Sequence, residues 1–181
     1  MAISAQHGGT CSGSLENVKT ILVPIDFSPV TRAVMAEAVS LAKSAGARLV
    51  LLHIAQPTPL VADYGPPMAG FVMPVMEAQE ENATRQLGRW RHRVDAQELP
   101  VMTVRLAGAA PSQLIVEEAE RRSADYIVMG SHGHTALYDL LVGSTTGGVL
   151  KKAPCPVIVI PARHSAPAQS VQAAQHIPRN A

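Results

Sequence analysis

Residues 19–29 read Lys-Thr-Ile-Leu-Val-Pro-Ile-Asp-Phe-Ser-Pro. From Thr20 to Ile25 the residues are apolar or β-branched without alternation, as expected of a strand that is covered on both faces of a parallel sheet. The four residues that follow are typical of a turn into a helix, with Ser28 as the N-cap and Pro29 at the first helical position. The stretch therefore predicts a central parallel strand that leads directly into a helix.

The same alternation of strand and helix continues along the chain. Apolar residues at helical spacing follow Pro29 and end at Gly46, where a residue in the left-handed conformation closes a helix. Further strands are expected at 48–54, 101–106, 126–129 and 157–160, and further helices at about 76–94, 112–122 and 143–152. The pattern predicts an α/β, Rossmann-like fold with a five-stranded parallel sheet and helices on both faces.

Length and composition predict one domain with loose ends. The chain has 181 residues, which suits a single domain at 18–162, between a flexible leader at 1–17 and a flexible tail at 163–181. Residues 56–74 hold five of the 14 prolines and are expected to form a long loop, whose role the sequence leaves open. Hydrophobic residues make up 47% of the chain, enough for a sizeable core.

Charge and cysteine content exclude several classes of function. The formal net charge of +1 provides no long-range attraction to nucleic acid or to an anionic membrane. Cys11 and Cys155 lack the spacing of a disulfide framework or a zinc site. Residues 1–17 lack a secretory signal, and the apolar runs are far shorter than a bilayer span. We therefore expect a cytoplasmic protein with no nucleic-acid or membrane partner.

A glycine-rich segment after the fourth predicted strand suits a polyphosphate. In parallel sheets ligands bind beyond the carboxyl ends of the strands where the strand order reverses, and this rule points to Asp26 and Gly130. Gly130 and Gly133 allow consecutive N–H groups to face an anion, and 143–146 lie at a helix N-terminus that favours negative charge. Local physics alone equally allows a plain turn and a plain helix cap, and neither a Walker A loop nor a GxGxxG fingerprint is present.

The spacing Gly130-x2-Gly133-x9-Gly143-Ser144 resembles the ATP-binding signature of the universal stress protein family. The opening 21–28, the second-strand ending at His53 and Ile54, and the closing 155–160 resemble the same family in the same order. The likeness covers about 18–161. It implies a fold of the adenine nucleotide alpha-hydrolase-like group and a site for ATP, or for AMP or ADP, with Mg²⁺ or Mn²⁺ carried on the phosphates.

The resemblance also implies a role for each part of the site. Asp26 would face the ribose and Ile54 the adenine, while 130–136 would wrap the phosphates and the following helix would close on them. The resemblance also implies a homodimer through the last strand, Val157 to Ile160. If this strand lies at the edge of the sheet, pairing with a second subunit would cover it. The implied nucleotide-binding residues are Pro24, Ile25, Asp26, Ile54, Met129, Gly130, Ser131, His132, Gly133, His134, Thr135, Ala136, Gly143, Ser144, Thr145 and Thr146.

Two other groups of residues allow a second interpretation. His132 and His134 have the chemistry of metal ligands or proton carriers, but no carboxylate cluster accompanies them, so no metal site is predicted. The arginines around Trp90 could bind nucleic acid, but residues 85, 89 and 93 follow helical spacing beside glutamates, which favours a solvated helix face. His53, at a strand end, is expected to be partly buried and hydrogen-bonded.

The resulting functional hypothesis is a regulatory ATP-binding protein with slow or no hydrolysis. No lysine or arginine lies within the glycine loop and no carboxylate is placed there to orient water, so no catalytic residue is assigned. The alternative is a nucleotide-independent dimeric interaction module. An adenylate-forming enzyme or nucleotidyltransferase would need other residues after the first strand, where this chain has Asp26-Phe-Ser-Pro.

Overall fold

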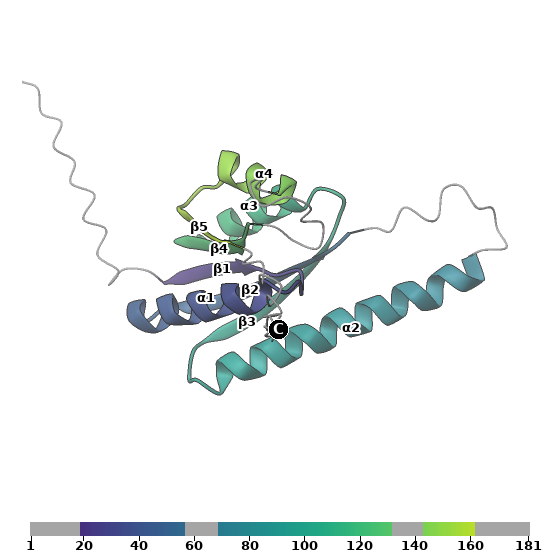
Figure 1. Ribbon diagram of the computed structural model, residues 1–181, viewed down its shortest axis with the longest axis horizontal. Helices are drawn as coiled ribbons and strands as arrows, with labels where there is room; N and C mark the ends of the chain where they lie inside the picture. Colours follow the sequence, from purple (N-terminus) through teal and green to yellow (C-terminus); the bar gives the residue numbers. More distant parts are fainter. Residues whose placement is uncertain (1–18, 57–68, 132–142, 162–181) are drawn as a thin grey trace, which may run out of the picture.

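The computed structural model describes residues 19–56, 69–131 and 143–161. Strands and helices alternate throughout these ranges, as the sequence predicts (Figure 1). The predicted leader, tail, most of the predicted loop and the glycine-loop residues 132–136 lie outside them. Among the described helices, none combines the length and the apolarity needed to cross a bilayer. The elements are β1 (Thr20–Pro24), α1 (Thr31–Ala45), β2 (Arg48–Ala55), α2 (Ala69–Asp95), β3 (Val101–Ala107), α3 (Pro111–Arg121), β4 (Tyr126–Gly130), α4 (Ser144–Lys152) and β5 (Val157–Ile160).

The five strands form one parallel sheet in the order β3-β2-β1-β4-β5. The chain moves from β1 outward to β2 and β3, and then returns to the other side of β1 for β4 and β5. The strand order therefore reverses between β1 and β4. This arrangement confirms the predicted fold class and places the reversal at the two strands whose carboxyl ends carry Asp26 and Gly130.

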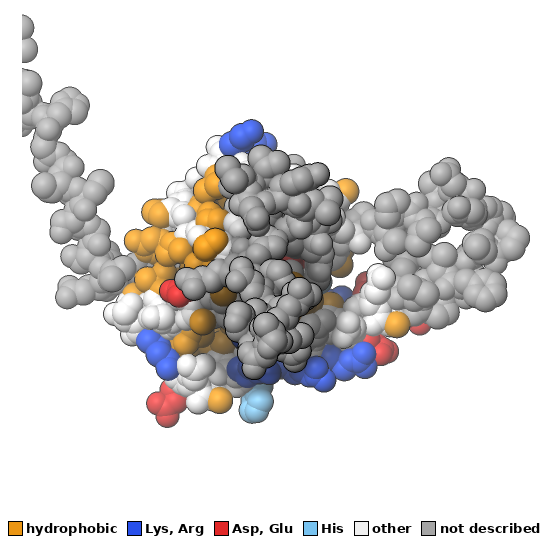
Figure 2. All heavy atoms as spheres, viewed as in Figure 1, with side chains coloured by type: hydrophobic (Ala, Val, Ile, Leu, Met, Phe, Trp, Pro, Cys, Tyr) orange, Lys and Arg blue, Asp and Glu red, His pale blue; other side chains and the backbone are white. Residues whose placement is uncertain are grey.

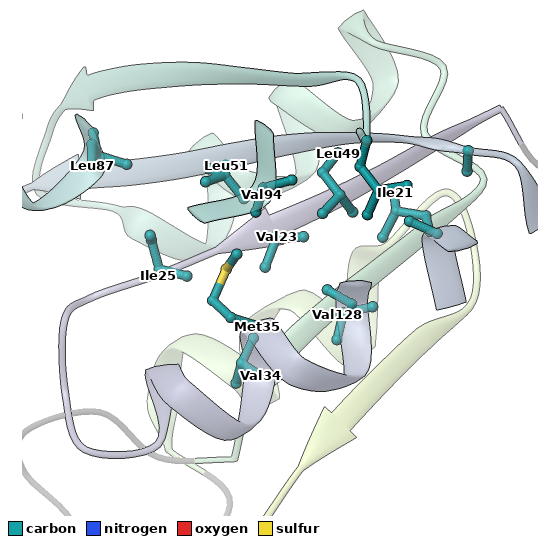
Figure 3. Close-up of a cluster of buried hydrophobic side chains, with 14 of the residues drawn as sticks. Ile21, Val23, Ile25, Val34, Met35, Leu49, Leu51, Leu87, Val94 and Val128 are labelled. Carbon is teal, nitrogen blue, oxygen red and sulfur yellow. The ribbon is translucent and has the colours of Figure 1, made fainter. Parts of the chain in front are cut away.

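A hydrophobic cluster fills each side of the sheet. Helices α1 and α2 cover one face and α3 and α4 cover the other (Figure 1). Because successive side chains of a strand point to opposite faces, Ile21 and Val23 enter the first cluster and Leu22 the second. All three have no exposed surface, which explains why β1 shows no polar alternation. Figure 3 shows the first cluster, where Val34 and Met35 of α1 lie against β1.

The predicted start of the first helix is wrong by two residues. Helix α1 begins at Thr31 with Val30 as its N-cap residue and no side-chain cap, so neither Ser28 nor Pro29 has the predicted role. The Asp26 carboxylate accepts the Ser28 N–H at 3.0 Å, and this local turn takes the place of an N-cap at Ser28. The predicted end is confirmed, because Gly46 has φ 63° and its N–H bonds the Ala42 carbonyl.

The predicted loop at 56–74 is too long. Helix α2 starts at Ala69 and continues for 27 residues, so Pro74 lies inside a helix and not in a loop. Proline removes its own N–H donor and disfavours a helix interior, which is why the sequence indicated a loop there. Helix propagation is cooperative, and the apolar residues of the later turns, Leu87 and Val94, are packed in the core and hold the helix to the sheet.

Two adjacent glycines of α4 have different surroundings, and one of them allows α4 to pack closely on α3. A Cβ atom added at Gly148 would lie 2.7 Å from both Cβ and Oγ of Ser112, whereas one added at Gly147 would meet nothing within 4 Å. Helix α4 therefore approaches α3 through Gly148, and this contact fixes the position of the α4 N-terminus.

We predict that Gly148→Ala is less stable than Gly147→Ala by about 1–3 kcal/mol, the usual range for overpacking. Both substitutions gain the same helix propensity, so the difference isolates the contact with Ser112. Urea unfolding of the two variants measures it. Equal free energies of unfolding would show that α3 and α4 do not pack through Gly148.

Candidate nucleotide-binding crevice

A cavity of about 520 Å³ opens beyond the carboxyl ends of β1 and β4, at the reversal of strand order. It is the place where ligands bind in open parallel sheets. The walls come from the ends of β1, β2 and β4, the start of α1, the turn before α3 and the N-terminus of α4. The lining residues are Pro24, Ile25, Asp26, Val30, Thr31, Val34, Leu52, Ile54, Gln56, Ala109, Pro111, Ile115, Met129, Gly130, Gly143, Ser144, Thr145 and Thr146.

The turn after β1 is held in place by several contacts. The Ile25 N–H donates to the Leu52 carbonyl at 2.8 Å, and Nδ1 of His53 lies 3.0 Å from the Ile25 carbonyl oxygen. The Phe27 ring lies 4.5 Å from the His53 ring, and Phe27 itself has a left-handed backbone with φ 62°. The prediction that His53 is partly buried and hydrogen-bonded is confirmed, and its contacts fix the turn that presents Asp26.

The N-terminus of α4 is joined to the end of β4 by backbone hydrogen bonds. The Ser131 N–H donates to the Ile160 carbonyl at 2.8 Å, and the Gly143 N–H donates to the Ser131 carbonyl at 2.9 Å. Residues 131 and 143 are thereby brought together although the chain between them is long. The first N–H groups of a helix have no partner within that helix, so this end of α4 offers donors and a positive dipole to the crevice.

The hydroxyl of Thr146 already has an acceptor. Its Oγ1 donates to the Gly130 carbonyl at 2.8 Å, and the side chain is buried with 3% of its surface exposed. A hydroxyl has a single hydrogen to donate, so the Thr146 side chain ties α4 to β4 and is not available as a donor to an anion. The hydroxyls of Ser144 and Thr145 carry that capacity, since Ser144 is exposed and Thr145 is partly exposed.

The structure brings most of the described candidate residues to one place. Ten of them line the crevice, whereas Ser131 supports its edge through the two backbone hydrogen bonds given above. His132, Gly133, His134, Thr135 and Ala136 lie outside the described residues. The ten candidate residues that line the crevice are Pro24, Ile25, Asp26, Ile54, Met129, Gly130, Gly143, Ser144, Thr145 and Thr146.

Sequence reasoning missed about half of the wall. Helix α1 contributes Thr31 and Val34, the end of β2 contributes Gln56, and the turn before α3 contributes Ala109 and Pro111. The turn after β3 could have been found, because it leaves the same edge of the sheet as the turns after β1 and β4. The α1 residues gave no separate signal, since their apolar spacing is that of an ordinary core helix.

The described lining of the crevice contains few ionisable side chains. Among the described lining residues there is one carboxylate, Asp26, and no lysine, arginine or histidine. Within the described ranges, no group of three or more His, Cys, Asp or Glu side chains could hold a metal ion. The donors to an anion are therefore backbone N–H groups and hydroxyls at the start of α4, facing an apolar wall that includes Ile54 and Ile25.

Comparison with known proteins places this architecture in one family. The universal stress protein family model matches residues 17–161. The universal stress protein MJ0531 of Methanocaldococcus jannaschii is 32% identical over 142 residues, which cover 78% of this chain and 81% of that protein. The solved structure of hypothetical protein MJ0577 superposes with a TM-score of 0.70 at 27% identity, covering 82% of this chain and 99% of that one.

A further structure, the universal stress protein from Archaeoglobus fulgidus in complex with dAMP, shares the fold with a TM-score of 0.55 at 22% identity. It covers 78% of this chain and 96% of its own. The family model extends across every strand of the sheet and across both the β1 and β4 walls of the crevice. The chain therefore belongs to the universal stress protein family.

Proposed function

We propose that this protein binds ATP in the crevice and acts as a regulatory, nucleotide-dependent stress-response factor with slow or no hydrolysis. The observation that carries the proposal is the meeting of two unlike surfaces at the reversal of strand order. One is an apolar wall at the ends of β1 and β2, and the other is the N-terminus of α4. A nucleotide has a flat apolar base and an anionic chain, and the crevice offers a matching surface to each.

The base and the sugar fit the β1 and β2 side of the crevice. Ile54 and Ile25 provide apolar contact for adenine, and Pro24 extends that wall. The Asp26 carboxylate lies at the mouth, where it is exposed, and its Oδ1 also accepts the Ser28 N–H. A carboxylate has further acceptor capacity, so Asp26 can accept hydrogen bonds from the ribose hydroxyls.

The phosphates fit the α4 side. Ser144 and Thr145 offer hydroxyl and backbone donors where the helix dipole favours negative charge. The segment 130–136, of which Gly130 lines the crevice, would add backbone donors from the glycine loop. Asp26 is the only carboxylate among the described lining residues, so Mg²⁺ or Mn²⁺ would be held mainly by phosphate oxygens.

The dAMP complex of the Archaeoglobus fulgidus protein supports an adenine nucleotide as the ligand class. We take ATP as the ligand rather than AMP or ADP because backbone donors extend along the first turn of α4 from Ser144 to Thr146, with the hydroxyls of Ser144 and Thr145 beside them. Efficient phosphoryl transfer uses a cationic side chain and a group that orients the nucleophile. The described lining contains no lysine or arginine, which supports slow turnover or none.

The alternative function is a nucleotide-independent interaction module that works through a dimer surface. Strand β5 lies at the edge of the sheet, and all four of its residues are partly exposed. An exposed edge is a template for strand pairing. We propose a homodimer through Val157 to Ile160, which is compatible with either function, so nucleotide binding is what separates the two.

We predict that Ser144→Asp weakens ATP binding by about tenfold, because the new carboxylate repels the phosphates. Two unit charges about 4 Å apart repel by roughly 1 kcal/mol in bulk water and by roughly 4 kcal/mol at an effective dielectric constant of about 20. Adenosine, which has no phosphate, should bind the variant as it binds the wild type. Calorimetric titrations with ATP and magnesium, and with adenosine, measure both affinities.

Ser144→Asn is the matched control, because it changes the size of the side chain without adding charge. An acidic residue in the first turn of a helix is favourable, so Ser144→Asp should keep its thermal stability. If Ser144→Asp weakens the binding of ATP and of adenosine equally, the phosphates do not lie at the N-terminus of α4. If wild-type protein ignores millimolar ATP with magnesium, the interaction module replaces the proposed function.

The proposed dimer has its own test in the backbone of β5. The Ile127 N–H donates to the Pro156 carbonyl and the Ser131 N–H to the Ile160 carbonyl, so the even-numbered residues of β5 bond to β4. In a parallel ladder the odd-numbered residues then direct their N–H and C=O groups to the open edge. Val159→Pro therefore removes a donor from the edge and leaves the bonds to β4 intact.

Light scattering after gel filtration should give a dimer for wild type, a dimer for the control Val159→Ala, and a monomer for Val159→Pro. Circular dichroism checks that the proline variant is folded. A wild type that is monomeric at high concentration, or a proline variant that is as dimeric as the wild type, would rule out pairing through β5.

A further inference from the structure

A second cavity, of about 270 Å³, lies between the turn after β1 and the C-terminal half of α2. Only Thr31 lines both this cavity and the crevice described above. The turn and the first residues of α1 provide one wall, and α2 provides the other. The lining residues are Phe27, Ser28, Pro29, Thr31, Arg32, Gln86, Arg89, Trp90 and Arg93.

Three guanidinium groups line this cavity without a carboxylate among its lining residues. They belong to Arg32 of α1 and to Arg89 and Arg93 of α2. In the described part of the chain, none of the three has a carboxylate within salt-bridge distance. Arg89 and Arg93 are also four residues apart on one helix, where like charges repel. The cavity therefore has a local positive charge that an anion would neutralise.

Two arginines near the cavity are paired with glutamates and do not line it. Arg85 pairs with Glu81, and Arg105 of β3 pairs with Glu80. Arg85, Arg89 and Arg93 are all exposed, as the predicted solvated helix face requires, and Arg89 and Arg93 also line the cavity. Lys and Arg side chains gather along this part of α2 on the side of the molecule shown in Figure 2.

An aromatic side chain orients one of the three guanidinium groups. Cζ of Arg93 lies 4.9 Å from the centroid of the Trp90 ring, a cation–π contact. Because the stacked group is held by its face, its N–H donors remain directed outward along its edges. Trp90 and Phe27 also cover part of the cavity wall, which reduces the water that competes for those donors.

A buried hydroxyl without a partner gives an independent indication of a ligand. Ser28 lines the cavity with 4% of its surface exposed, and its Oγ has no hydrogen-bond partner. A buried polar group that stays unsatisfied destabilises a protein, so such groups are rare without a function. Oγ itself is enclosed, so an oxyanion in the cavity would accept its hydrogen after rotation of the Ser28 side chain toward the cavity.

We propose that this cavity is a second anion site that binds inorganic diphosphate or a longer polyphosphate chain. A guanidinium matches the oxygens of phosphate with paired donors. A single phosphate group carries about −1.5 to −2 charges at pH 7, so it would leave part of the charge of three arginines uncompensated. Two linked phosphates carry more negative charge and present oxygens to both walls, where Arg32 of α1 and Arg93 of α2 lie.

The experiment titrates inorganic pyrophosphate into the full chain, without divalent metal and at constant ionic strength set with chloride. Calorimetry measures affinity, and Trp90, the single tryptophan of the chain, reports occupancy of this cavity through its fluorescence. We expect saturable binding with a change in Trp90 emission. Removing two charge-assisted partners in Arg89→Gln/Arg93→Gln should weaken binding at least about tenfold.

Arg91→Gln is the matched control, because Arg91 lies on the same helix but outside the cavity lining, and its loss removes charge without touching the site. Ser144→Asp should leave the Trp90 response unchanged, which separates this site from the crevice. The absence of a saturable Trp90 response, or equal weakening in Arg91→Gln and Arg89→Gln/Arg93→Gln, would overturn the proposal.

Ser28→Ala tests the hydroxyl separately and does not depend on the arginines. Without pyrophosphate the variant should be at least as stable as the wild type, because an unsatisfied buried hydroxyl is removed. With pyrophosphate it should bind more weakly than wild type. A loss of stability in the free variant would show that the Ser28 hydroxyl already has a partner, and it would contradict the site.

Discussion

The burial of β1 on both faces is the constraint on which the rest of this structure depends. Ile21, Leu22 and Val23 have no exposed surface, and β1 pairs with β2 on one side and β4 on the other. Asp125, just before β4, fixes this pairing, since its Oδ2 accepts the N–H groups of Lys19 and Thr20 at 2.8 and 2.9 Å. With β1 central, the connection that leaves β1 runs toward β2, and the connection that leaves β4 runs toward β5 on the opposite side. The separation of these two connections opens the crevice at the carboxyl ends of β1 and β4.

The chemistry of the two cavities follows from how each wall is built. The crevice takes its anion donors from a helix terminus and from hydroxyls, and its lining includes no positively charged side chain among the described residues. Such a lining would position an anionic ligand by geometry. The second cavity has the opposite character, with three guanidinium groups around an aromatic side chain. Because Thr31 lines both, the first residue of α1 is the structural link between them.

The sequence predicted the strands and their alternation with helices along the chain, because unbroken apolar runs identify strands that are buried on two faces. It also predicted both sides of the crevice, since the reversal of strand order makes the ends of β1 and β4 neighbours. The sequence prediction was wrong or silent where a contact joins residues that are far apart in the chain, or where a contact overrides a local rule such as helix capping. The start of α1 moved because Asp26 accepts the Ser28 N–H, and the hydroxyl of Thr146 bonds to Gly130, 16 residues away. The grouping of Arg32 with Arg93 depends on how α1 and α2 pack, which spacing alone does not reveal.

Methyl NMR of isoleucine-labelled protein during an ATP titration shows whether ATP binds at the reversal of strand order. Ile25, Ile54 and Ile115 line the crevice from three different elements or turns, whereas Ile21 is buried in the core and Ile158 lies on β5. ATP with magnesium should shift the signals of the first three and leave the other two in place. The largest shifts at Ile158, or no shift at millimolar ATP, would contradict binding at this place.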